Sequence, residues 1–242
     1  MVMSEESPQQ PASLNPSVPT ELANIVRAGV KAGREVPGAV ALGGTVCSLY
    51  ARHRLSLDID FGVADLRQRF HQVRGHLLEL EGWQEADVRV PVLILGSIDG
   101  VEIGFRQLRR NTPFDTLSVR TADGDLVVPT LDEMLLTKAF LIYDRNRTRD
   151  FVDFAELACL ETDASVVETL SKMDAKFGWD KQPSVMLGAL KTLLHGEPAD
   201  SDTHGYSTFR WLAPRLKSWE QVQSKCRAIG DLLARRILGA KP

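Results

Sequence analysis

The sequence has few cysteines, no long apolar run and no pattern of an amino-terminal leader. Its three cysteines (Cys47, Cys159 and Cys226) are odd in number, lie far apart and form no CxxC or Cys/His cluster. This spacing excludes a disulfide framework and a zinc site of the usual kind. No apolar run approaches the roughly 18 residues that a membrane-spanning helix needs. The first residues lack the basic start and apolar centre of a secretory signal. We therefore expect a reduced, cytoplasmic protein without a membrane segment.

The chain also lacks an overall positive charge, because its formal net charge is −3. It is therefore not expected to coat nucleic acid by bulk electrostatics. The exception is the stretch from Gly205 to the carboxyl end, where only Glu220 and Asp231 oppose eight cations: Arg210, Arg215, Lys217, Lys225, Arg227, Arg235, Arg236 and Lys241. This local excess indicates either a solvated helix face or an RNA-binding surface.

The order of the predicted elements indicates an α+β fold in two parts. Four prolines among polar residues predict a disordered arm over 1–19. Residues 20–129 alternate between amphipathic helices and strands, which predicts a mixed sheet with flanking helices. Residues 130–242 show almost only helical periodicity, and we expect this helical domain to complete a cleft with the first. The chain has 242 residues, enough for two such cores.

Periodicity and turn residues place the individual elements. Apolar positions at helical spacing predict helices that begin near Thr20 and near Leu66. Short apolar runs predict strands at 39–42 and 57–61, and strand pairs joined by turns are predicted at 88–95 with 101–105 and at 117–120 with 126–128. A short helix is expected at 45–52, and longer ones at 131–144, 148–160, 163–177, 183–195 and 217–237. Thr130 and Glu133 form the pattern of a capping box at the first of these.

Two aspartates in the segment 57–61 carry the strongest chemical signal. Because side chains alternate along a strand, Asp58 and Asp60 share one face, while Leu57 and Ile59 share the other. Two such carboxylates can hold Mg²⁺, which prefers a few carboxylates together with phosphate oxygens. The alternative is a solvated strand face, but aspartate is depleted in strands. A glycine pair, Gly43-Gly44, lies one short helix upstream and can expose backbone N–H groups to a phosphate.

The combination resembles the DNA polymerase β-like nucleotidyltransferases, and more narrowly the AbiEii/AbiGii-type nucleotidyltransferase toxins. The residues that carry the resemblance are Gly43-Gly44-Thr45, Tyr50, His53-Arg54, Ser56, Asp58-Ile59-Asp60-Phe61, Lys138 and the helix segment from Thr148 to Phe154. It covers about residues 20–160. The helical remainder contains no motif that we can match to the family.

The resemblance implies a role for each matched residue. It implies that Asp58 and Asp60 bind Mg²⁺ and that Gly43, Gly44, Thr45 and Lys138 hold the triphosphate of a nucleoside triphosphate. By itself Lys138 is typical of a lysine that extends to the surface. A third carboxylate is expected on a neighbouring strand. Glu102 is the candidate, although the superfamily more often has Asp at this position. The alternative for Glu102 is a side chain that faces outward from the strand. Asp99, in a predicted turn, is the second choice for the third carboxylate.

Further residues are expected at or near the nucleotide. Arg149 begins a helix, where the dipole disfavours a cation, which indicates an external anion or a local salt-bridge network. We expect Asp150 in catalysis and Asp153 with the nucleotide or with Lys138. Arg54 and Ser56 either contact the nucleotide or brace the strand, and His53 could do either.

These expectations define a function and its alternatives. The chain is predicted to be a Mg²⁺-dependent enzyme that transfers a nucleoside monophosphate to an acceptor. The resemblance implies an RNA acceptor, such as a tRNA 3′ end, and a toxin with a cognate antitoxin protein. The alternatives are a small-molecule or protein hydroxyl as the acceptor, or a catalytically silent module that binds a nucleotide or a partner.

Overall fold

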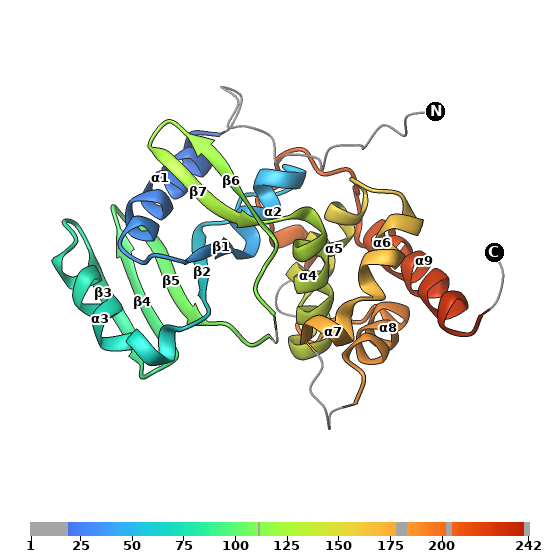
Figure 1. Ribbon diagram of the computed structural model, residues 1–242. Helices are drawn as coiled ribbons and strands as arrows, with labels where there is room; N and C mark the ends of the chain where they lie inside the picture. The colour runs from blue at the N-terminus through green and yellow to red at the C-terminus, as the bar shows by residue number, and fades with distance from the viewer. Residues whose placement is uncertain (1–18, 111, 178–182, 202–204, 240–242) are drawn as a thin grey trace, which may run out of the picture.

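A computed structural model describes residues 19–110, 112–177, 183–201 and 205–239. Apart from Pro19, which precedes the first helix, the arm predicted over 1–19 lies outside these ranges. The sheet and the helical bundle occupy opposite ends of the molecule (Figure 1). The prediction of an α+β fold is confirmed.

The first half is built on a five-stranded sheet. Its strands are β1 (Val40–Leu42), β2 (Asp58–Val63), β3 (Gln84–Arg89), β4 (Leu93–Ile98) and β5 (Val101–Gln107), in the spatial order β1-β2-β5-β4-β3. The β2/β5 pair is parallel and the other pairs are antiparallel. A separate hairpin of β6 (Thr116–Thr121) and β7 (Gly124–Pro129) follows. Three helices complete this half: α1 (Thr20–Arg34), α2 (Gly43–Ala51) and α3 (Leu66–Glu79).

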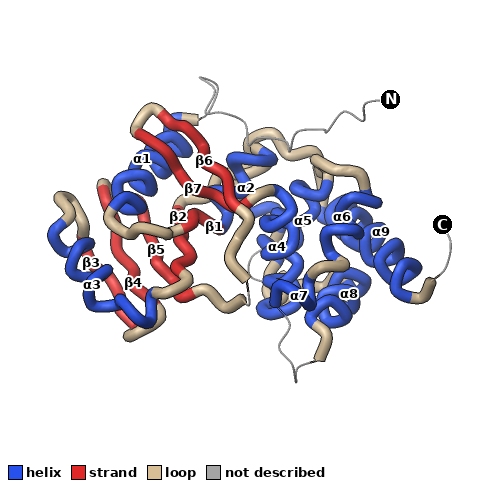
Figure 2. The backbone as a smooth tube through the Cα atoms, in the orientation of Figure 1, coloured by secondary structure: helices blue, strands red, loops and turns tan. Residues whose placement is uncertain are grey.

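The second half contains helices and no strand among the residues that the structure describes (Figure 2). The helices are α4 (Leu131–Arg145), α5 (Thr148–Ala158), α6 (Asp163–Leu170), α7 (Met173–Phe177), α8 (Val185–His195), a short 3₁₀ turn η1 (Tyr206–Thr208) and α9 (Trp219–Ile237). As the capping pattern predicts, Thr130 accepts a hydrogen bond from the Glu133 N–H. The Glu133 carboxylate does not complete a reciprocal cap. It binds Arg110 and Lys176 instead.

Close packing of α1 against the sheet decides which face of β2 is buried. Two glycines one helical turn apart, Gly29 and Gly33, face β2. A Cβ atom on Gly29 would lie 2.5 Å from Ile59 Cδ1, and one on Gly33 would lie 3.1 Å from the Phe61 ring. Phe61 stacks on Phe105 of β5, with ring centroids 5.0 Å apart. The apolar side chains of β2 therefore face α1, and the alternating positions face the helical half.

Residues distant in sequence hold the two halves together. Leu55 N–H donates to the Arg210 carbonyl at 2.8 Å, and Leu212 N–H donates to the His53 carbonyl at 2.9 Å. The chain between η1 and α9 thus returns to the segment that precedes β2. Buried Arg110 also reaches Glu133 of α4, with Nη1 and Oε2 2.7 Å apart. These contacts fix the helical half over the polar face of the sheet.

Two predicted elements are wrong in extent. The strand predicted at 88–95 is the end of β3 and the first half of β4, which are separated by a turn at Val90-Pro91. The helix predicted at 163–177 is broken into α6 and α7. Its apolar positions Val166, Leu170, Met173 and Phe177 are all buried and keep helical spacing across the break. Periodicity alone therefore does not reveal the interruption.

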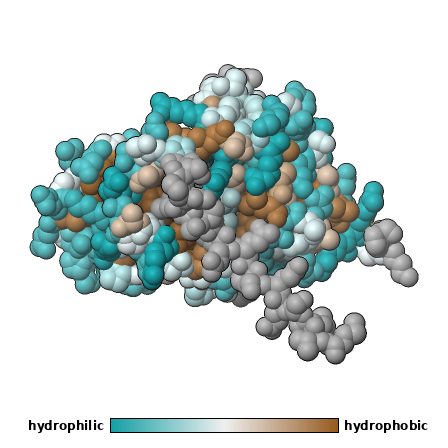
Figure 3. All heavy atoms as spheres, turned by 90° about the horizontal axis from the view of Figure 1, so that it is seen from above, coloured by the Kyte–Doolittle hydropathy of each residue, from teal (hydrophilic) through white to brown (hydrophobic). Residues whose placement is uncertain are grey.

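The outer surface seen from above is mostly hydrophilic, and hydrophobic side chains form scattered patches near the middle of that face (Figure 3). Among the described residues, no helix has both the length and the apolarity needed to cross a lipid bilayer.

Candidate nucleotidyltransferase site

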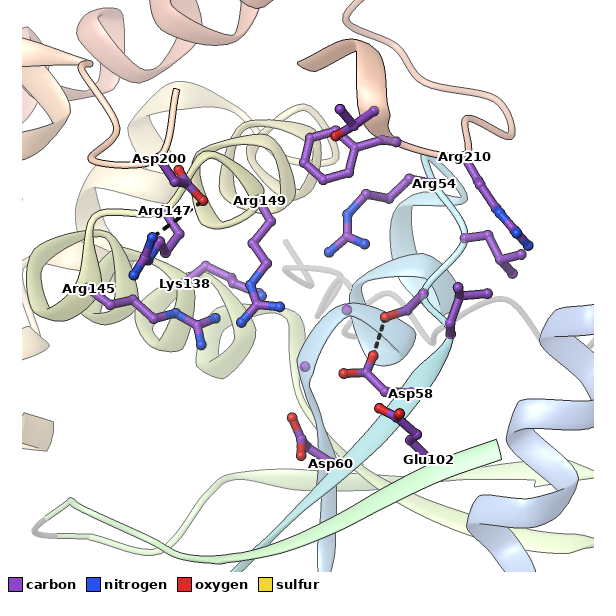
Figure 4. Close-up of a pocket in the computed structure, with 17 residues that line it drawn as sticks. Arg54, Asp58, Asp60, Glu102, Lys138, Arg145, Arg147, Arg149, Asp200 and Arg210 are labelled. Carbon is purple, nitrogen blue, oxygen red and sulfur yellow. Dashed lines mark hydrogen bonds and ion pairs between the residues drawn. The ribbon is translucent and has the colours of Figure 1, made fainter. Parts of the chain in front are cut away.

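A pocket of about 840 Å³ lies between the polar face of the sheet and the helical half. Most of its lining residues are charged or glycine, and both halves contribute (Figure 4). The acidic residues are Asp58, Asp60, Glu102 and Asp200, and the basic ones are Arg54, Lys138, Arg145, Arg147, Arg149 and Arg210. A pocket with acids on one wall and cations on the other can hold a metal ion together with an anion.

The acidic wall is built by β2 and β5. Asp58 and Asp60 both line the pocket, as the alternation along β2 predicts. Glu102 is the direct register partner of Asp58 on β5, so these two side chains emerge on the same face. Gly104 is the partner of Asp60. A Cβ at Gly104 would lie 2.4 Å from Asp60 Oδ1, so this glycine leaves room for the Asp60 carboxylate.

Both aspartates already have polar neighbours. The Ser56 hydroxyl donates to Asp58 Oδ1 at 2.7 Å, and Arg106 Nε donates to Asp60 Oδ1 at 3.0 Å. Within the described ranges, no three His, Cys, Asp or Glu side chains form a closed set of metal ligands. Mg²⁺ does not need such a set, because it is usually held by one or two carboxylates, water and the phosphates of a substrate. The donor chemistry of Asp58 and Asp60 fits that mode.

The glycine turn lies beside the carboxylates. Gly43 begins α2 with a φ of +80°, a conformation that glycine adopts without strain. Leu42 is the N-cap residue and provides no side-chain hydrogen bond to the first turn of α2. The backbone N–H groups there remain available to an anion. A Cβ on Gly44 would lie 2.5 Å from Ser56 Oγ, so Gly44 allows Ser56 to approach this turn.

Lys138 provides the centre of the basic wall. It lies on α4 with a relative exposure of 1% and still lines the pocket. The sequence-only alternative, a lysine that extends to the surface, is therefore wrong. Lys138 Nζ is 2.8 Å from Asp153 Oδ2 and 3.3 Å from Asp150 Oδ1. Burial by itself lowers the pKa of this lysine, but Asp153 and Asp150 beside it raise the pKa above the ordinary value, so Lys138 is charged.

Arginines extend the basic wall around Lys138 (Figure 4). Arg145 Nε is 2.6 Å from Asp150 Oδ2, and Arg147 Nη1 is 3.9 Å from Asp200 Oδ2. Arg149 is exposed and lines the pocket. No side chain in the described part of the chain pairs with Arg149. Of the two readings of this arginine, the arrangement supports an external anion rather than a local salt bridge.

Asp153 is the shared counterion of three buried groups. It accepts hydrogen bonds from Arg54 Nε at 2.7 Å and Arg54 Nη2 at 2.9 Å, contacts Lys138, and lies 2.7 Å from His53 Nε2. Burial raises the pKa of this carboxyl, but Arg54 and Lys138 outweigh burial and hold the pKa well below its usual range. Asp153 therefore stays ionised and orients Arg54 and Lys138 toward the pocket.

A family model with the description "Nucleotidyl transferase AbiEii toxin, Type IV TA system" matches residues 42–211 of this chain. The chain belongs to this family. It is therefore a nucleotidyltransferase, of the toxin family of type IV toxin–antitoxin systems. The match begins just before the glycine turn and ends at Trp211, so it includes every residue that lines the pocket.

A solved structure supports the fold. MenT4, a nucleotidyltransferase toxin from Mycobacterium tuberculosis, superposes with a TM-score of 0.56 and 12% identity, over 88% of this chain and 82% of MenT4. An antigenic nucleotidyltransferase-like protein from Paracoccidioides brasiliensis gives a TM-score of 0.48 and 15% identity, over 75% of this chain and 90% of that protein. At these identities the likeness of MenT4 to this AbiEii-family chain concerns the fold alone.

A partial similarity also exists to a transport protein. The mycolic acid-containing lipids exporter MmpL11 of Mycolicibacterium smegmatis is 31% identical over 125 residues, which is 50% of this chain and 13% of the exporter. This chain thus spans about an eighth of the length of the curated relatives that it matches. The export activity belongs to that protein.

Several residues predicted for the site lie in the pocket, and others do not. Among the predicted residues, the pocket is lined by Gly43, Gly44, Arg54, Ser56, Asp58, Asp60, Glu102, Lys138 and Arg149. Thr45 is buried and is not among the residues that line the pocket; its hydroxyl donates to the Asp58 carbonyl at 2.6 Å, so it braces β2. Asp150 and Asp153 are fully buried behind the cations and do not line the pocket. Their contacts suit positioning of Lys138, Arg145 and Arg54. Asp99, the second choice for the third carboxylate, lies in the β4–β5 turn, outside the pocket lining.

The sequence did not indicate which residues near the carboxyl end line the pocket, although Arg210 belongs to the basic stretch noted above. Thr208, Phe209 and Arg210 line the pocket, and so does Asp200, which also caps α5 by accepting from the Thr148 N–H at 2.7 Å. A visible signal was the cluster of Tyr206, Phe209 and Trp211 within a polar, basic stretch. Aromatic residues at that density in a connecting segment indicate a docked segment rather than a free loop.

Proposed function

We propose that this chain transfers a nucleoside monophosphate from a nucleoside triphosphate to an RNA hydroxyl, with Mg²⁺ held by Asp58 and Asp60. The observation that carries the proposal is the pairing of these carboxylates, on one face of β2, with the basic wall across the same pocket. The acidic side attracts a divalent cation and the basic side attracts a polyphosphate. A metal–triphosphate complex satisfies both sides at once.

We assign the triphosphate to the glycine turn and the basic wall. The free N–H groups at the start of α2 and the positive end of that helix favour phosphate oxygens. Lys138, Arg145 and Arg149 supply positive charge on the opposite side. Lys138 and Arg145 are held by buried Asp150, so their orientation is set before the nucleotide arrives. Prior orientation matters because donors that are already in place need no reorganisation during the reaction.

The reaction needs positioning more than covalent chemistry. The acceptor hydroxyl oxygen forms a bond to the α-phosphorus, the bond between that phosphorus and the oxygen bridging to the β-phosphate breaks, and pyrophosphate leaves. A pocket carboxylate receives the hydroxyl proton. When bound, Mg²⁺ neutralises phosphate charge and aligns the two reacting oxygens. Glu102, beside Asp58 in the β2/β5 register, is the residue that we assign as the third carboxylate.

We propose tRNA 3′ ends as the acceptor and a cognate antitoxin protein as the partner, in the cytoplasm, where nucleoside triphosphates and tRNA are present. Membership of a type IV toxin–antitoxin family supports the antitoxin. The carboxyl-terminal basic excess gives limited support for RNA, because Lys225 and Arg236 pair with Asp163 and Glu168 of α6. Among the described basic residues from Gly205 onward, Arg210 lines the pocket.

The test is transfer of labelled nucleotide by the wild type and by Asp58→Asn. Loss of a carboxylate that stabilises transition-state charge removes several kcal/mol, so activity should fall by about 10³-fold or more. Asp99→Asn is the matched control, because Asp99 is exposed in a turn with a φ of 51° that asparagine tolerates. Unfolding in urea tests whether both variants remain folded. Retention of activity in folded Asp58→Asn would refute the site.

The same assay separates the acceptors. Purified protein is supplied with each nucleoside triphosphate and with total tRNA, with small alcohols of the aminoglycoside kind, or with protein. Labelling of a small molecule or a protein instead of RNA would replace the proposed acceptor. No Mg²⁺-dependent binding of any nucleoside triphosphate in calorimetry would make the chain a silent module.

A further inference from the structure

The pocket has two chemically different ends. Lys138, Arg145, Arg147 and Arg149 gather at one end, and Arg210 lies at the opposite end, beyond Arg54 (Figure 4). The first end concentrates positive charge, as a polyphosphate requires. Among the described residues that line the second end, Arg210 is the one cation without an ion-pair partner, so this end suits a group with one negative charge.

The second end is built by the segment that precedes α9. Three backbone hydrogen bonds hold it: Leu55 N–H to the Arg210 carbonyl at 2.8 Å, Leu212 N–H to the His53 carbonyl at 2.9 Å and Ala213 N–H to the Arg52 carbonyl at 2.9 Å. The Trp211 ring packs between Tyr206 and Phe209, with centroids 4.3 Å and 5.5 Å away. The segment is therefore fixed in position beside β2, and Phe209 and Arg210 are presented to the pocket.

Apolar surface gathers at this end of a pocket that is otherwise charged. Leu57 lines the pocket although 55% of its surface is exposed. Leu55 and Phe209 line the pocket as well. The centroid of the Phe209 ring lies 5.3 Å from the guanidinium carbon of Arg54, which also lines the pocket. An exposed leucine and an aromatic ring next to an arginine that lines the pocket are suited to the flat face of a nucleobase in single-stranded RNA.

Arg210 supplies the matching charge. It is exposed, and within the described residues its side chain makes no ion pair or hydrogen bond. Each nucleotide of a single strand carries one backbone phosphate, which an unpaired arginine can bind. The carboxylate end of the pocket is close to the same segment, because Leu57 immediately precedes Asp58.

We infer that Leu57, Phe209 and Arg210 form the subsite for the terminal nucleotide of the RNA acceptor. Its unpaired base stacks on Phe209 and contacts Leu57, and its phosphate binds Arg210. This places the acceptor at one end of the pocket and the triphosphate at the other, with Asp58 between them. The inference rests on the proposed function, since it names how that site holds its acceptor.

The experiment measures KM for the RNA acceptor and, separately, KM for the nucleoside triphosphate. Phe209→Leu keeps an apolar side chain and removes the ring, and Phe209→Trp restores a ring. Stacking of one base contributes about 1–3 kcal/mol, so Phe209→Leu should raise the RNA KM roughly 5- to 150-fold. Phe209→Trp should recover most of the loss. The KM for the nucleoside triphosphate should stay unchanged in both variants.

Arg210→Ala gives an independent reading. Loss of one phosphate contact should lower the slope of log affinity against log salt concentration by about 0.7 for single-stranded RNA. Arg120→Ala is the control, because Arg120 lies on β6 with a side-chain exposure of 91% and does not line the pocket. This control should leave the salt slope unchanged.

The outcomes are distinguishable. If the wild type labels no acceptor, the proposed function fails and the subsite fails with it. If the wild type labels RNA but neither Phe209→Leu nor Arg210→Ala changes the RNA KM, the function stands and the subsite is overturned. A rise confined to the KM for the nucleoside triphosphate would assign the ring to the donor base. An equal rise in both KM values would mean that Phe209 only braces Arg54, which would overturn the subsite. Labelling of a small alcohol but not of RNA would also overturn it.

Discussion

The shared counterion Asp153 gives the sharpest test of how the site is built. In Asp153→Asn, Lys138 and Arg54 remain buried, at 1% and 7% exposure, but lose the carboxylate that contacts both. Lys138 keeps only Asp150, at 3.3 Å. Removing one partner of a buried ion pair costs about 3–5 kcal/mol, because a buried charge is left uncompensated. The free energy of unfolding, measured in urea at neutral pH, should fall by that amount.

Nucleotide transfer should fall in the same variant although Asp153 does not line the pocket. Asp153 orients Arg54 and Lys138, and a misplacement of about 1 Å in a positioning group can cost roughly 10²-fold in rate. The measurement is kcat/KM for the nucleoside triphosphate under conditions in which the variant is folded. Glu85→Gln is the matched control, because Glu85 pairs at the surface with Arg74 and such a pair contributes about 0–1 kcal/mol.

One result would refute this reasoning. If Asp153→Asn unfolds within about 1 kcal/mol of the wild type and transfers nucleotide at the wild-type rate, Asp153 is not the counterion that fixes the two cations. Other contacts would then have to hold Lys138 and Arg54 in place.

The remaining predictions concern Gly104, Gly75 and the pH dependence of the Asp153 contribution. Gly104→Ala should lower transfer strongly with little loss of stability, because the new Cβ would lie 2.4 Å from Asp60 Oδ1; transfer equal to the wild type would contradict the tight fit. Gly75→Ala should raise the free energy of unfolding by about 0.5–1 kcal/mol, since Gly75 lies in α3 with open space around it, and a loss measured in urea would contradict this. The pKa of Asp153 is lower in the folded protein than the value of 3.8 of an unfolded aspartate. The stability difference between the wild type and Asp153→Asn should therefore be complete above pH 3.8 and should shrink as the pH falls toward the folded pKa. Urea titrations at several pH values measure this difference, and a difference that grows with acid would contradict the prediction.

Local patterns were sufficient for much of the fold. The helices predicted at 131–144, 148–160 and 217–237 agree with α4, α5 and α9 within two residues at each end. They could be predicted because each buries one face at helical spacing. The same logic failed where a break preserves the period, as between α6 and α7. It also missed the separation of β3 from β4, although Pro91, which cannot donate a backbone hydrogen bond, marked the turn.

The sequence by itself determined the acidic wall of the site. Alternation along β2 is a property of the backbone, so Asp58 and Asp60 had to share a face, and the glycines of α1 and the apolar Ile59 and Phe61 decided which face that is. Only the tertiary structure decided the basic wall and the acceptor end. Burial of Lys138, the three-way contact of Asp153 and the return of Arg210 to the segment before β2 each join residues that are far apart in the chain. No local pattern encodes such contacts, because they form only when the two halves pack together.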